Sequence, residues 1–346
     1  MQLSTSVAQP AVTPKAARLS PWLSGLAKAA VAVVLITWMV KTGRLDIKSL
    51  AGAFRHKGLL LGAAALCYGQ IFVTGVRWHL LLISQGVRLK FKDTLALNMI
   101  GTLFNTVIPG AVGGDVMKGY YLSRRAPGRR TQALTTLLID RVVGLLALLL
   151  VSILAASWNS DLVRQSHGIQ VLLAIAAAGL AAGVEGFAFA LVLGNRLLSI
   201  IEPLAARFRP VLIFRKVLLA IIQYQHHKGV LALSVLISLF NHGLGIGMFY
   251  LCAQALGTAP VNMNIAQFLL VVPLGLVTTA IPISPAGVGV GQAAFFTLFS
   301  LLPGYSGRLG SEACTVFQVV MIAVYLTGFI VYIFYRHESE ADDVGR

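Results

Sequence analysis

The sequence predicts an all-α polytopic membrane protein with six spanning helices and two broken re-entrant hairpins, arranged as an inverted 4+4 repeat. Three observations lead to this prediction. Apolar residues make up 57% of the 346 residues and charged residues only 12%, which is typical of a chain dissolved in lipid and excludes a soluble enzyme. Several apolar runs can cross a bilayer core, which takes about 20 helical residues. Two further runs are broken near the middle by Pro and Gly.

The positive charge of the chain fits the same class. The formal net charge is +16, which is typical either of a nucleic-acid-binding protein or of basic cytoplasmic loops between spans. The basic residues cluster in short stretches between apolar runs, and no nucleic-acid-reading motif is present, so we expect no nucleic-acid partner. The three cysteines lie apart in apolar stretches, and we expect neither a disulfide framework, nor a metal site, nor a cofactor.

The chain divides into three parts. Residues 1–19 form a polar N-terminus and residues 336–346 a tail, both expected in the cytoplasm. The part between them, 20–335, is expected to be an integral membrane domain with repeat halves 20–156 and 169–335. Its six predicted spans are 20–40, 58–83, 131–156, 169–193, 229–256 and 313–335.

The broken runs, 93–121 and 265–302, each divide into two arms. Basic loops at 84–92 and 118–130 flank the first run, so the positive-inside rule predicts that it enters and leaves from the cytoplasm. The loop 194–228 is predicted inside, and the second run is predicted to dip from outside. The scheme places 18 Lys or Arg in the inside loops and tails and 7 outside, although the basic loop 41–57 falls outside. Inverted repeats with such breaks at matching positions are typical of transporters.

The first break reads Asn-Thr-Val-Ile-Pro-Gly-Ala-Val-Gly-Gly-Asp. Irregular backbone at membrane depth is tolerated only beside protein or a watery cavity, and the N-H groups that begin the second arm favour an anion. The alternative is a structural kink in which the Asp is a plain N-cap. The candidate substrate-binding residues here are Asn105, Pro109, Gly113, Gly114 and Asp115.

The second break repeats the Ile-Pro and the Gly-rich turn of the first. The alternative interpretation is tight helix packing by small residues. The candidate substrate-binding residues here are Pro282, Ser284, Pro285, Gly287, Gly289 and Gln292.

Buried ionisable residues are candidates for function because they are costly in lipid. Asp140 and Arg141 are adjacent on a helix and point about 100° apart, so Arg141 needs another partner, either Asp115 or Glu185. The alternative is an ion pair that only locks helix packing. Asn241 and His242 complete the supporting residues, although a lone buried His is usually a satisfied core residue. The run from Arg77 to His79 is interpreted as an interfacial anchor.

Three motifs carry a family resemblance: the first break from Asn105 to Asp115, the run from Asp140 to Leu145, and the second break from Pro282 to Gly289. Together they resemble the flippase-like transmembrane domain of lysylphosphatidylglycerol synthetases, over about residues 25–335. The resemblance implies movement of a lipid between leaflets, but it does not identify which lipid this chain moves. Members often carry Glu at the position of Gln292, which puts an acidic role there in doubt. Only residues 336–346 follow the last span, so we expect no aminoacyl-transferring domain.

We therefore expect a lipid translocator in the cytoplasmic membrane, with an anionic headgroup held by backbone N-H groups of the two turns and by Arg141. A glycosyl or lipid-headgroup transferase is the first alternative, although no D-x-D motif is present. The second alternative is an accessory subunit that binds a lipid-synthesis enzyme.

Overall fold

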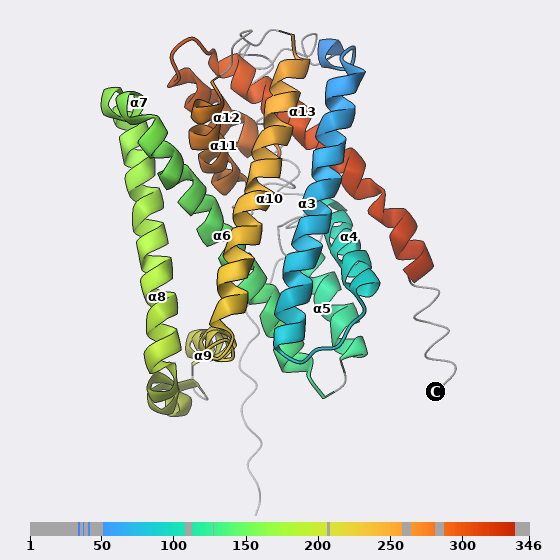
Figure 1. Cartoon of the computed structure of the whole chain (residues 1–346), viewed down its shortest axis with the longest axis vertical. Coiled ribbons are helices and arrows are strands. Elements are labelled where there is room, and N and C mark those ends of the chain that lie inside the picture. Colours follow the sequence, from blue (N-terminus) through green and yellow to red (C-terminus); the bar gives the residue numbers. More distant parts are fainter. Residues whose placement is uncertain are drawn as a thin grey trace, which may run out of the picture.

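The computed structural model describes residues 34, 37, 41, 51–107, 113–126, 128–205, 208–257, 264–280 and 287–335. These residues form α-helices with short connections and no strand. Element labels follow Figure 1.

Five helices in the described part are long and apolar enough to cross a membrane, so the chain is a multi-pass membrane protein. They match five of the six predicted spans and run lengthwise through the molecule (Figure 1). Of the predicted span 20–40, only Val34 and Thr37 are described. The five are α3 (Lys57–Ser84), α6 (Arg130–Trp158), α8 (His167–Ala205), α10 (Lys228–Ala255) and α13 (Gly307–Leu326), whose candidate span continues to Tyr335.

The two broken runs form pairs of short helices, as predicted. The first pair is α4 (Phe91–Val107) and α5 (Gly113–Arg125), and the second is α11 (Ile265–Ala280) and α12 (Val290–Ser300). None of these four reaches the about 20 residues that a spanning helix usually takes. In Figure 1 the first pair lies beside the end of α3, whereas the second pair lies in the opposite half of the molecule.

Aromatic side chains pack the second pair into the main core. Phe295 of α12 stacks on Phe249 of α10 with ring centroids 4.4 Å apart. Phe268 of α11 and Phe299 of α12 meet edge to face at 5.4 Å. The absence of a side chain at Gly275 leaves room for the Phe295 ring. A separate cluster around Trp78, Leu97 and Tyr121 packs the first pair.

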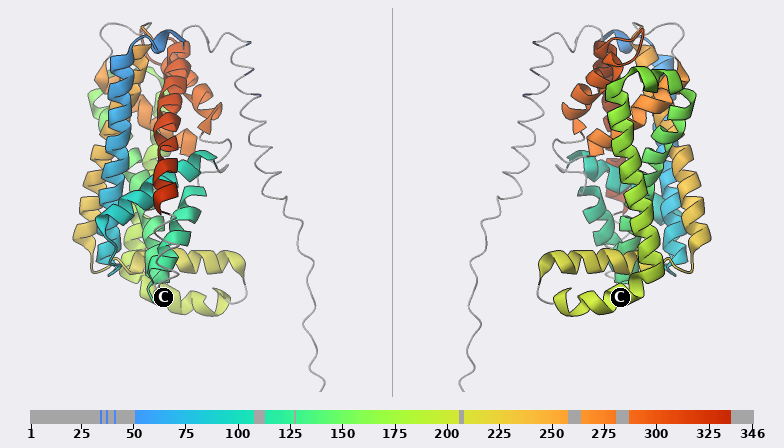
Figure 2. Two further views of the ribbon diagram at one scale, coloured as in Figure 1. Left: turned by 90° about the vertical axis from the view of Figure 1, so that its right-hand side faces the viewer. Right: turned by 90° about the vertical axis from the view of Figure 1, so that its left-hand side faces the viewer.

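Residues 194–228 differ from the predicted inside loop. A short helix, α7 (Ser160–Gln165), precedes α8, and α8 extends to Ala205, twelve residues beyond the predicted end at 193. After residues 206–207, α9 (Arg209–Ile222) begins. Figure 2 shows α9 and the last turns of α8 side by side across the axes of the spans. The stretch is amphipathic, and its many basic residues hid this helical pattern in the sequence.

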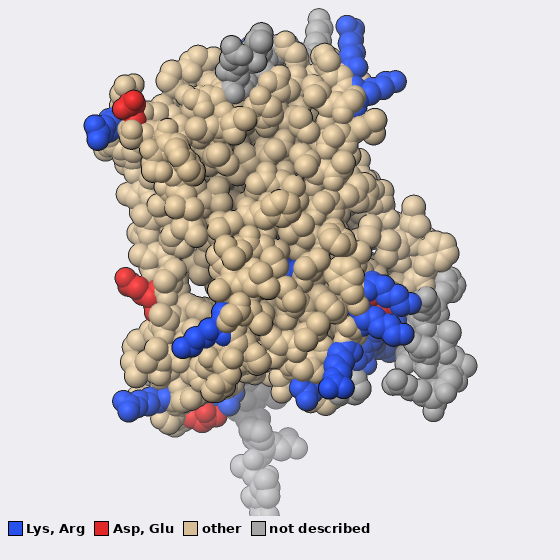
Figure 3. All heavy atoms as spheres, viewed as in Figure 1, with Lys and Arg blue, Asp and Glu red and all other residues tan. Residues whose placement is uncertain are grey.

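Charged side chains concentrate at one end. On the face in Figure 3, most Lys and Arg gather where α3 ends and α10 begins, which we call the basic end, and the middle of the face is largely uncharged. The three cysteines, Cys67, Cys252 and Cys314, are free and buried, as expected for small membrane-embedded residues.

Candidate functional site

Arg141 pairs with Asp115 at the start of α5. Its Nε donates to Asp115 Oδ2 at 2.8 Å and its Nη2 to Oδ1 at 3.1 Å. One of the two expected partners is thereby confirmed. The pair joins the middle part of α6 to the turn of the first hairpin, because Asp115 lies in the first turn of α5.

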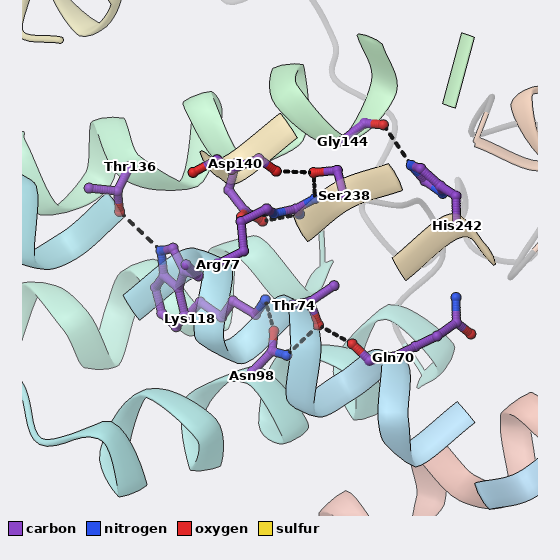
Figure 4. A network of polar contacts seen from close by, with 12 residues as sticks. Gln70, Thr74, Arg77, Asn98, Lys118, Thr136, Asp140, Gly144, Ser238 and His242 are labelled. Carbon is purple, nitrogen blue, oxygen red and sulfur yellow. Dashed lines mark hydrogen bonds and ion pairs between the residues drawn. The ribbon is translucent and has the colours of Figure 1, made fainter. Parts of the chain in front are cut away.

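Asp140, the neighbour of Arg141, points elsewhere and pairs with Arg77 of α3. The Arg77 Nε and Nη2 donate to the two carboxylate oxygens at 2.8 and 3.0 Å. The Arg77 Nη1 donates to Ser238 Oγ of α10 at 2.6 Å, as Figure 4 shows. The interpretation of Arg77 as an interfacial anchor is therefore wrong: its head is buried and joins three helices. The missing side chain at Gly144 leaves room for it.

Lys118 of α5 is buried in the same region. Its Nζ donates to Asn98 Oδ1 of α4 at 2.6 Å and lies 5.1 Å from the centre of the Trp78 ring. Asn98 is itself oriented by α3, because its Nδ2 donates to Thr74 Oγ1 at 2.9 Å (Figure 4). The described ion pairs include no carboxylate within 4 Å of Lys118, so its direct contacts are with a neutral amide and an aromatic face.

These side chains form one charged group with an excess of positive charge. Its members are Arg77, Lys118 and Arg141 against Asp115 and Asp140, and Lys118 interacts electrostatically with all four others. The two ion pairs differ in exposure. The side chains of Arg77 and Asp140 are 7% and 15% exposed, whereas those of Arg141 and Asp115 are 47% and 23% exposed. The Arg141 pair is thus the accessible edge of the group.

This group lies far from either end of the bundle. Arg141 is eleven residues into the 29-residue α6, or about 16 Å along a helix some 43 Å long. An accessible ion pair at that depth is costly unless water, protein or a polar ligand surrounds it. Its position therefore favours a polar ligand site.

The first turn uses one of the backbone groups expected to bind an anion. The Gly114 N-H donates to Asn105 Oδ1 at 2.8 Å, so Asn105 caps the start of α5. A Cβ on Gly114 would collide with the carbonyl oxygen of Gly101, which explains the glycine. Gly113 is buried beside it, and Pro109 lies outside the described residues.

The second turn is closed by its own side chains. Gly289, at φ 85°, is the N-cap residue of α12, and its N-H donates to Gln292 Oε1 at 2.6 Å. The Gln292 Nε2 donates to Gln318 Oε1 of α13 at 2.7 Å. Gly287, at φ 71°, packs against Thr279. The structure thus gives Gln292 capping and packing contacts. Three further candidates, Pro282, Ser284 and Pro285, lie outside the described residues.

The remaining supporting residues do not join the charged group. Glu185 lies on an exposed face of α8, and Arg141 pairs with Asp115 instead. His242 Nε2 contacts the Gly144 carbonyl oxygen at 2.9 Å, which satisfies it as a core residue (Figure 4). Asn241 accepts a hydrogen bond from Gln70 at its backbone oxygen.

The interpretation of the sequence missed Arg77, Lys118 and Asn98 as members of the group. Arg77 lies seven residues before the end of α3, and Lys118 was assigned to a basic loop. One signal could have found Lys118. It lies three residues after Asp115, so on a helix both face the same side.

An apolar groove lies beside the group, on the outer face of α3 and α10. Its volume is about 410 Å³, and Phe72, Val73, Val76, Leu236, Ile237 and Phe240 line it. Because all of its lining residues are apolar, the groove is suited to a hydrocarbon chain. Among the described residues, no three His, Cys, Asp or Glu side chains are placed to hold a metal ion.

The family model described as the lysylphosphatidylglycerol synthase TM region matches residues 25–328. None of the curated proteins matches the chain.

Proposed function

Because the chain belongs to the family of the lysylphosphatidylglycerol synthase TM region, we propose that it is a lipid translocator. It moves a lipid with an anionic or modified headgroup between the leaflets of the cytoplasmic membrane. The accessible Arg141–Asp115 ion pair at membrane depth carries this proposal.

The proposed orientation follows the distribution of charge. The basic end faces the cytoplasm, since the basic stretches 88–92 and 124–130 flank the first hairpin there. The first hairpin then enters from the cytoplasm and the second from outside, with 20–40 as the first span of an inverted 4+4 repeat. The positions of the two hairpins in opposite halves of the molecule support this arrangement (Figure 1).

In the proposed mechanism, a headgroup phosphate replaces Asp115 on Arg141. A guanidinium binds two phosphate oxygens as well as two carboxylate oxygens, so the exchange keeps both hydrogen bonds. The excess positive charge of the group compensates a singly charged phosphodiester, with Lys118 held near it by Asn98. The backbone N-H groups of Gly114 and Gly289 are already used, so the cationic side chains bind the anion. The acyl chains stay in lipid and in apolar grooves such as that of α3 and α10.

The test is leaflet exchange of headgroup-labelled lipids in liposomes that contain the purified full chain. Zwitterionic, anionic, aminoacylated and polyprenyl-phosphate lipids are compared. We expect exchange of one anionic or modified class, and Arg141→Ala should slow it by about tenfold or more, because a hydrogen-bonded charged contact is lost.

Arg125→Ala is the matched control. Arg125 pairs with Asp93 at 3.2 Å at the other end of the same hairpin, so its loss should leave exchange near that of the natural chain. If the folded protein exchanges no class, the proposal is wrong, and the headgroup transferase and the accessory subunit become the better explanations. Equal exchange by Arg141→Ala and the natural chain would also contradict it.

A further inference from the structure

The last turns of α8 and all of α9, residues 195–222, form an element that we call the transverse hairpin. It lies at the basic end, crosses the axes of the spans and projects beyond the bundle (Figure 2). Arg215 of α9 pairs with Glu202 of α8 at 2.7 Å, so the two arms are joined to each other.

Large apolar side chains of the transverse hairpin are exposed. Ile200, Phe208 and Phe214 are 65%, 51% and 50% exposed. An apolar surface of this kind is unfavourable in water and is typical of a site that contacts a membrane or a protein. Its location on a membrane protein, at the ends of the spans, favours the membrane.

Basic residues accompany this apolar surface. Residues 195–222 hold five Lys or Arg against a single acid, Glu202. Glu202 is neutralised by Arg215, and Arg196 is exposed. Apolar side chains together with basic ones are typical of helices that lie in the headgroup layer and are attracted by anionic lipid.

Hydrogen bonds to α3 and α6 fix the position of the transverse hairpin along the axes of the spans. Directly after α9, the Gln223 Oε1 accepts a hydrogen bond from Thr135 Oγ1 of α6 at 3.0 Å. The next residue, Tyr224, is buried and donates to the Leu81 carbonyl oxygen of α3 at 3.3 Å. Thr135 lies in the second turn of α6, so α9 is held where a spanning helix leaves the hydrocarbon core.

We infer that the transverse hairpin is a binding surface for anionic phospholipid in the leaflet at the basic end. Ile200, Phe208 and Phe214 enter the boundary of the acyl chains. The basic side chains contact the lipid phosphates. This inference goes beyond transport, since it concerns a surface separate from Arg141.

The test places an environment-sensitive fluorophore on Phe214→Cys in the full chain, in nanodiscs with lipid quenchers near the headgroups. The natural thiols are buried and should not react. We expect quenching that grows when phosphatidylglycerol is added to phosphatidylcholine and that declines with salt. Arg196→Gln should raise the phosphatidylglycerol needed for half of the quenching by about fivefold.

Arg164→Gln is the control, because Arg164 is exposed at the opposite end of the spans, in α7. It should leave the quenching unchanged. Ile200→Cys carries the same label on the other arm, in case the first position disturbs folding. Labels that remain in water in every lipid would contradict the inference. Quenching that is equal with and without phosphatidylglycerol would overturn its anionic part.

Discussion

The two hairpins share a Pro and Gly break but surround it with different chemistry. The first carries Asp115 and Lys118 close to its turn, and both interact with polar or charged side chains of other helices. The described arms of the second, 265–280 and 287–300, contain no charged residue, and phenylalanines hold them in the core.

The comparison shows that the break and the residues beside it have different roles. The break allows the chain to turn at membrane depth, whichever residues flank it. The flanking residues decide what the turn does: the first hairpin places charge beside α6, whereas the second forms a packed support. Substitutions in the second hairpin should therefore change stability, and those in the first should also change lipid exchange.

The largest effect is expected for Phe295→Ala, which removes a fully buried ring from the second hairpin. The cavity and the lost contacts with Phe249 should cost about 4 kcal/mol of unfolding free energy. Thermal unfolding in detergent measures the loss. Phe329→Ala is the control, because Phe329 is 55% exposed. Similar losses of unfolding free energy in both variants would contradict the interpretation that the second hairpin is a packed support.

The next effect is expected for Arg77→Ala, beside the first hairpin. It leaves the Asp140 carboxylate without its partner and should cost about 3 kcal/mol, the low end for a broken buried pair, because the Asp140 side chain is 15% exposed. Unfolding of Arg77→Ala, Asp140→Asn and the double variant gives the coupling energy. If the double variant loses as much unfolding free energy as the two single variants added together, the two side chains do not stabilise the fold as a pair.

A smaller loss is expected for Gly114→Ala in the first turn. The added methyl group meets the Gly101 carbonyl oxygen and the Asn105 side chain, so α4 and α5 must separate, at about 2 kcal/mol. Gly186→Ala is the control, because its Cβ meets nothing within 4 Å and Ala is the better helix former. The same destabilisation in both would show that the close approach is unimportant.

The smallest effect is expected at the second turn. Gln292→Ala removes the acceptor for the Gly289 N-H and should cost about 1 kcal/mol. Gln292→Glu keeps that acceptor, and Gln318 can turn its amide to donate, so it should cost less. The temperature of thermal unfolding should therefore be highest for the natural chain, lower for Gln292→Glu and lowest for Gln292→Ala. Lipid exchange by Gln292→Ala should be nearly unchanged, and its loss would show that this turn has a role in binding.

Hydropathy and the Pro and Gly breaks were enough to predict five long apolar helices and two pairs of short ones, because lipid imposes length and satisfied backbone groups. The pairing of Arg141 was narrowed to two acids by the same logic. Arg77 was misassigned because, near a helix end, a snorkelling arginine and a paired one have the same sequence pattern. Lys118 was missed because its burial depends on Asn98 and Trp78, which only the tertiary structure brings to it.

The contacts of Arg77 have a mechanical consequence. Its guanidinium joins α3, α6 and α10, and opening that contact would leave a buried charge unpaired, at about 3 to 5 kcal/mol. These three helices therefore behave as a rigid frame. Relative motion should cost least at the more exposed joint, where Asp115 of α5 meets Arg141 of this frame. The three helices and α4, which Asn98 bonds to α3, then form the fixed part, and the start of α5 is the part that moves against it.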